Sequence, residues 1–68
     1  MNYTKTVQDM IEQFWETSGK YRYEASMDQV SADENAMLFC IKKYPMIKPY
    51  EVIRILRKER ERVDEENK

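Results

Sequence analysis

The sequence has no histidine, and it has only one cysteine, one glycine and two prolines among its 68 residues. A structural zinc site needs about four nitrogen or sulfur ligands, and this chain offers one thiol. One cysteine cannot form an internal disulfide, and one glycine is too few for a phosphate-binding loop. Without histidine there is no Ser-His or Cys-His pair that activates a nucleophile. The composition therefore predicts no metal, no cofactor and no enzymatic activity.

Long hydrophobic runs are missing as well, since no apolar stretch approaches the ~20 residues that cross a membrane. The start of the chain also lacks the pattern of a secretory signal peptide. Charged residues make up 37% of the chain and hydrophobic residues 41%, and the net charge is −1. This balance is typical of helices with charged outer faces rather than of a disordered chain. We therefore expect a soluble cytoplasmic protein that does not bind membranes.

Apolar side chains recur every three or four positions over residues 3–17, which predicts a first helix. Asn2 or Thr4 is suited to cap its start, because either side chain accepts a hydrogen bond from a free backbone N–H. Gly19 is expected to end the helix, because glycine adopts the left-handed C-terminal conformation at no steric cost.

The next stretch, residues 20–31, fits either an extended segment or a helix. Two capping boxes compete there, one beginning at Ser26 and one at Ser31. The second is favoured, and it predicts a helix over residues 32–43. Pro45 ends that helix, because proline disfavours helical geometry in the residue before it.

A third helix is expected over residues 49–64, because Pro49 suits a first helical position. Its apolar stripe weakens after Leu56, and the charged tail is expected to fray near Glu65. The predicted fold is all-α, a small three-helix bundle with a charged C-terminal helical tail, in a single domain over residues 1–68. The expected core contains Val7, Met10, Ile11, Phe14, Met37, Cys40, Ile41, Val52, Ile53 and Leu56.

More apolar residues are present than one small core can bury. Leu38 and Phe39 point away from the main stripe of their helix, and further apolar residues surround the second connection. Aromatic and methionine side chains in such places are common at adaptable binding surfaces, although closure of the core by the connection is the alternative. Two tyrosines interleave with cations at residues 20–23, where they pack on the first helix, bind a protein partner or stack on single-stranded nucleic acid. The candidate protein interface comprises Leu38, Phe39, Met46, Ile47, Tyr50, Tyr21 and Tyr23.

A basic run in the third helix suggests nucleic-acid binding as an alternative function. Its candidate residues are Arg54, Arg57, Lys58 and Arg62, in an arrangement similar to a helix-turn-helix. However, residues 49–68 contain six basic and six acidic side chains. Three basic residues have a carboxylate four positions later, so the helix neutralises itself, whereas phosphate binding needs uncompensated positive charge.

The remaining reactive groups indicate no chemistry. Cys40 lies on the apolar stripe and is expected to be a buried thiol. The carboxylate pairs Asp33/Glu34 and Glu65/Glu66 are expected to lie in solvent, outside any apolar pocket. The hypothesis is a non-enzymatic binding or regulatory protein that contacts another protein or a second copy of itself as a homodimer.

Overall fold

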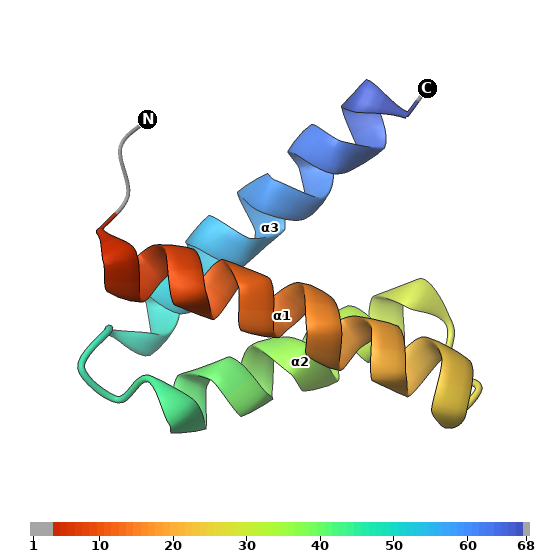
Figure 1. The fold of residues 1–68 in the computed structure, drawn as a ribbon, viewed down its shortest axis with the longest axis horizontal. Coiled ribbons are helices and arrows are strands. Elements are labelled where there is room, and N and C mark those ends of the chain that lie inside the picture. The colour runs from red at the N-terminus through yellow and green to blue at the C-terminus, as the bar shows by residue number, and fades with distance from the viewer. Residues whose placement is uncertain (1–3, 68) are drawn as a thin grey trace.

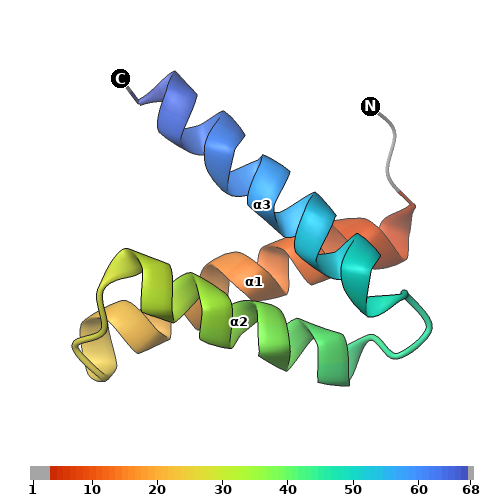
Figure 2. The same ribbon diagram turned by 180° about the vertical axis from the view of Figure 1, so that it is seen from behind.

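The computed structural model describes residues 4–67, which form three helices and no strand. The helices are α1 (Lys5–Glu24), α2 (Gln29–Lys43) and α3 (Pro49–Glu66). Helices α1 and α2 run antiparallel as a hairpin, and α3 crosses them at an angle (Figures 1 and 2). The C-terminal half of α3 projects past the hairpin in both views. The prediction of an all-α three-helix bundle is confirmed.

Helix α1 is longer than the sequence pattern predicts. Thr4 caps its start, because its Oγ1 accepts a hydrogen bond from the Val7 N–H at 3.2 Å. Residues 2 and 3 of the prediction lie outside the described residues. The predicted end before Gly19 is wrong, since the helix continues to Glu24. Packing outweighs the low helix propensity of glycine here, because Thr17 and Ser18 are buried side chains of α1.

The connection between α1 and α2 places its left-handed residue at Ser26, which has φ 56°. Helix α2 begins at Gln29, three residues before the predicted start. Neither predicted capping box forms, because the cap is Asp28, whose Oδ1 accepts a hydrogen bond from the Ser31 N–H at 2.7 Å. That backbone hydrogen bond holds the pKa of Asp28 below its ordinary value. The predicted end of the helix at Lys43 is confirmed.

Helix α3 begins at Pro49 as predicted and continues to Glu66, so the expected fraying near Glu65 is not found. Charge pairs along the helix support its last turns. Arg62 is bonded to Glu59 at 3.0 Å and to Glu66 at 2.8 Å. The first of these hydrogen bonds is the main reason why the pKa of Arg62 lies above its ordinary value.

The core lies where the first half of α3 meets the hairpin. Its buried side chains are Met10, Phe14, Ala36, Met37, Cys40, Val52, Ile55 and Leu56. Ile55 and Ala36 were not in the predicted core. The predicted core residues Val7, Ile11, Ile41 and Ile53 are only partly buried and pack against the edge of this cluster. The described residues include no helix that is both long and apolar enough to span a membrane.

Candidate docking surface on helix α2

The outer face of α2 carries apolar side chains that the core does not use. Helix α2 buries Ala36, Met37 and Cys40 against the other two helices. Leu38 and Phe39 turn away from that face and keep 58% and 39% of their surface exposed. The predicted orientation of these two side chains is therefore found in the structure.

A hollow of about 220 Å³ lies on the α1 side of Leu38. Tyr21 lines it from α1, and Asn35, Phe39 and Lys42 line it from α2. The Lys43 Nζ lies 5.7 Å from the centre of the Phe39 ring, where the ammonium is attracted by the negative face of the ring. This hollow combines an aromatic wall with polar groups.

A second hollow of about 220 Å³ lies on the α3 side of Leu38. Its lining is mostly apolar, with Met37 and Ile41 from α2 and Ile53 from α3. Glu34 and Arg57 stand at its polar rim. The hollow is bounded by α2 on one side and α3 on the other, so its width depends on how α3 is held.

The second hollow continues into a third, of about 290 Å³, through the shared residues Glu34, Met37 and Arg57. Val30 lines this third hollow and is 67% exposed. The two hollows adjoin each other between α2 and α3, and together we call them the groove. We call the outer face of α2 with its flanking hollows the α2 docking surface, defined by Tyr21, Glu34, Leu38, Phe39, Lys42, Ile53 and Arg57.

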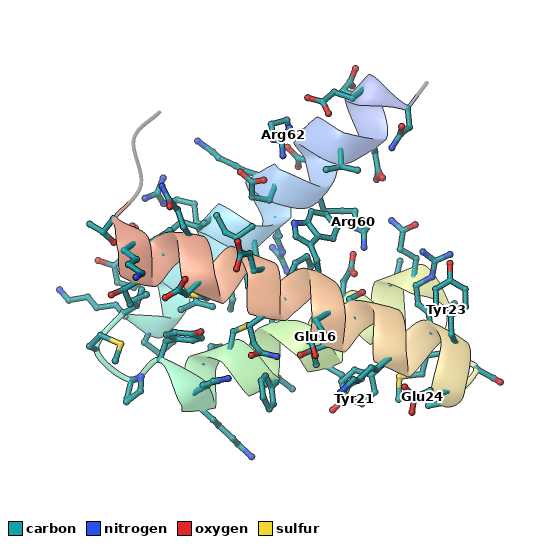
Figure 3. The ribbon with its side chains drawn as sticks, viewed as in Figure 1. Glu16, Tyr21, Tyr23, Glu24, Arg60 and Arg62 are labelled. Atoms are coloured by element: carbon teal, nitrogen blue, oxygen red, sulfur yellow. The ribbon has the colours of Figure 1, made fainter. Side chains whose placement is uncertain are left out.

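An ionic cluster that joins all three helices lies beside the third hollow, which Asp33 and Arg60 help to line. Arg60 of α3 donates two hydrogen bonds of 2.8 Å to Asp33 of α2. Asp33 Oδ1 also accepts a 2.6 Å hydrogen bond from Ser18 Oγ of α1. The Arg60 guanidinium lies 4.6 Å from the centre of the Trp15 ring. Figure 3 shows Arg60 in the space between α3 and the hairpin, whereas Arg62 lies on the opposite side of α3.

The buried position of Asp33 corrects the expectation that it lies in solvent. Its side chain is only 9% exposed, because the spacing from Asp33 to Ala36 and Cys40 places it on the buried stripe of α2. That spacing was the available signal in the sequence. The partner on α3 could not be found in the same way, because the pairing of Asp33 with Arg60 depends on the crossing of two distant helices.

The other predicted interface residues lie apart from the α2 docking surface. Tyr23 is 80% exposed and lies on the opposite side of α1 from Tyr21 (Figure 3). Met46 and Tyr50 are 68% and 63% exposed around the connection between α2 and α3. Ile47 is partly buried and packs against the core, so it helps the connection to close the bundle.

The four candidate nucleic-acid residues are all exposed on α3. Two of them are paired with carboxylates. Arg54 is hydrogen-bonded through two nitrogens to Glu51, and that contact lowers the pKa of Glu51. Arg62 is bonded to two glutamates, as described above, while Arg57 lies at the rim of the groove. Lys58, the residue that follows Arg57 in the sequence, is also exposed.

Groups with catalytic or metal-binding potential are few in the described part of the chain. Cys40 is fully buried, as predicted, and its burial raises the pKa of the thiol to about 11. The nearby positive charge of Lys43 opposes this shift only in part. Within residues 4–67 no group of three or more cysteine, aspartate or glutamate side chains is placed to hold a metal ion.

Comparison of the chain with protein-family models, with curated proteins and with solved structures finds no match in any of the three.

Proposed function

We propose that this chain is a non-enzymatic binding protein that docks a helix of another protein chain on the α2 docking surface. The observation that carries the proposal is Leu38, which is 58% exposed on a ridge with a hollow on either side. Helices pack when the ridge of one enters the groove of another, and this surface presents both. A helix that presents an apolar side chain to this surface fits it best.

A docked helix would cover a substantial part of this small chain. A standard interface buries about 800 Å² of each partner, and the described chain exposes 4934 Å². Docking therefore requires about a sixth of the accessible surface. The face of α2 with its two hollows extends over all three helices, because Tyr21 and Ile53 line it from α1 and α3.

Three further parts of the proposal concern the nucleic-acid alternative, the cellular setting and the role of the chain. The nucleic-acid alternative through Arg54, Arg57, Lys58 and Arg62 has less support, because carboxylates neutralise Arg54 and Arg62. A reduced cytoplasmic setting suits the single buried thiol, since disulfides are rare there. The proposal includes a regulatory role, as an inhibitor or adaptor, for a chain that would act by binding.

The test is site-specific photo-crosslinking in native cells. A photoreactive amino acid at position 38 is expected to give a covalent protein adduct, because Leu38 lies at the centre of the contact. The same group at position 58 is the control, since Lys58 is exposed on α3 and lines none of the three hollows. Protein adducts of equal yield at both positions, or none at position 38, would reject the docking surface. A nucleic-acid adduct at position 58 alone would favour the alternative.

A further inference from the structure

The charges along the outer ridge of α2 are arranged symmetrically about Leu38. Glu34 lies four residues before Leu38 and Lys42 lies four residues after it, and all three side chains are exposed. Residues four apart form a continuous ridge on a helix. Within residues 4–67 neither Glu34 nor Lys42 takes part in an ion pair. The ridge therefore has an acidic end, an apolar centre and a basic end at equal spacing.

We propose that the helix docked on this surface is α2 of a second copy of the same chain, in antiparallel orientation about a two-fold axis near Leu38. This inference rests on the proposed docking function and names its partner. Under this symmetry Leu38 lies beside Leu38 of the second copy, and Glu34 of each copy faces Lys42 of the other. A parallel arrangement would instead place Glu34 beside Glu34, so the charges select the antiparallel one.

The shape of the surface has the same self-complementarity. A two-fold interface uses the same patch on both copies, so the patch must contain both the projecting group and its receptor. Leu38 projects, and the hollow lined by Met37, Ile41 and Ile53 lies directly beside it. The Leu38 side chain of each copy enters the apolar hollow of the other. Rows of residues four apart pack against each other with a crossing of about 50°, so the contact is centred on Leu38.

A second copy explains these observations better than an unrelated partner does. An unrelated helix needs no opposite charges at equal distances from the central apolar residue. Antiparallel α2 helices also bring opposite ends of the helix dipoles together, which is favourable. In addition, association covers exposed Leu38 in a domain whose single core is small.

The experiment is sedimentation equilibrium with charge-reversed variants of the whole chain. The wild-type chain is expected to sediment at twice its 8.3 kDa mass. E34K and K42E each create like charges at both symmetric contacts, and each is expected to weaken self-association about tenfold or more. An equal mixture of E34K and K42E restores both attractive pairs, and so does the double variant E34K/K42E.

Matched controls separate this pairing from net charge and from folding. K58E changes the net charge as K42E does, and E24K changes it as E34K does, but both residues lie outside the α2 docking surface. Both controls are expected to associate like the wild type. Circular dichroism is expected to show the same helix content for every variant, because each substituted side chain is exposed.

The outcomes distinguish the two proposals. A wild-type chain that sediments as a monomer up to about 1 mM overturns the self-pairing. Single variants that dimerise like the wild type, or a mixture that does not recover, overturn it as well. A monomer whose position 38 still crosslinks to a different protein leaves the docking function standing and rejects the second copy. A monomer without any adduct at position 38 rejects both.

Discussion

Replacement of Arg60 by methionine tests whether the ionic cluster holds α3 on the hairpin. Arg60 and Asp33 are only 17% and 9% exposed in their side chains, so R60M leaves a mostly buried carboxylate without its cationic partner. Removing one partner of a buried pair costs about 3–5 kcal/mol. The remaining hydrogen bond from Ser18 offsets part of that cost, so we expect R60M to lose about 3 kcal/mol of unfolding free energy.

The complementary substitution, D33A, is expected to cost about 1.5–3 kcal/mol, because hydrogen bonds to a charged group contribute about that much. In this variant Arg60 keeps its cation–π contact with the Trp15 ring and its ion pair with Asp64 at 3.9 Å. Its charge therefore still has partners. The double variant leaves no buried charge at this site and is expected to be no less stable than R60M alone. The cycle should therefore give a coupling of about 2 kcal/mol.

Urea unfolding followed by circular dichroism measures these free energies. A domain of this length has a total stability of about 3–10 kcal/mol, so R60M is measured in a stabilising osmolyte together with the wild type. A cost below about 1 kcal/mol for R60M, or a coupling below about 0.5 kcal/mol, would refute the assignment of Asp33 and Arg60 as a buried, mutually dependent pair.

Three further predictions follow from local features of the fold. Burial raises the pKa of Cys40 from 9.0 to about 11. The contribution of the neutral thiol to the unfolding free energy is therefore fully present below pH 9, and about 3 kcal/mol is lost between pH 9 and 11. Urea titrations across this range should show that decrease in the wild type and a smaller one in C40A, where Tyr44, whose pKa burial also raises, still contributes. G19A is expected to stabilise the protein by about 1 kcal/mol, because a Cβ at that helical position meets no atom within 4 Å; a lower thermal midpoint would contradict this. Asp28 has a lowered pKa, so its contribution is present above about pH 4 and is lost as acid protonates it. D28N, which still caps the helix, should show a smaller loss in acid unfolding curves.

The periodicity of apolar residues was sufficient to predict the three helices and most of the core, since helical spacing determines which side chains share a face. Their boundaries were harder to predict where local signals compete with packing. Gly19 carries a local stop signal, yet α1 continues because Ser18 beside it is buried against α2. Asp28 caps α2 in place of the two serines, and no local rule ranks these three residues.

The candidate surface was predictable only in part, for a related reason. Leu38 and Phe39 were placed on the outer face of α2 by helical spacing alone. The hollows beside them depend on how the helices cross, which a single sequence does not specify. Asp33 and Arg60 are 27 residues apart, and their hydrogen bonds arise from the same crossing. Ile47 was predicted to lie at the interface, but it packs against the core. An apolar residue in a connection can either pack inward or stay exposed, and the sequence does not distinguish the two.

The position of Arg60 along α3 has a mechanical consequence. Helix α3 leaves the connection at Pro49, and its core residue Val52 lies only about 5 Å along the axis, whereas Arg60 lies about 16 Å along it. A contact farther from the pivot opposes rotation with a longer lever arm. The hydrogen bonds between Arg60 and Asp33 therefore oppose rotation of α3 about its N-terminal end more effectively than an equally strong contact at Val52 does. These hydrogen bonds restrain the angle between α2 and α3, and this angle determines the width of the groove beside Leu38.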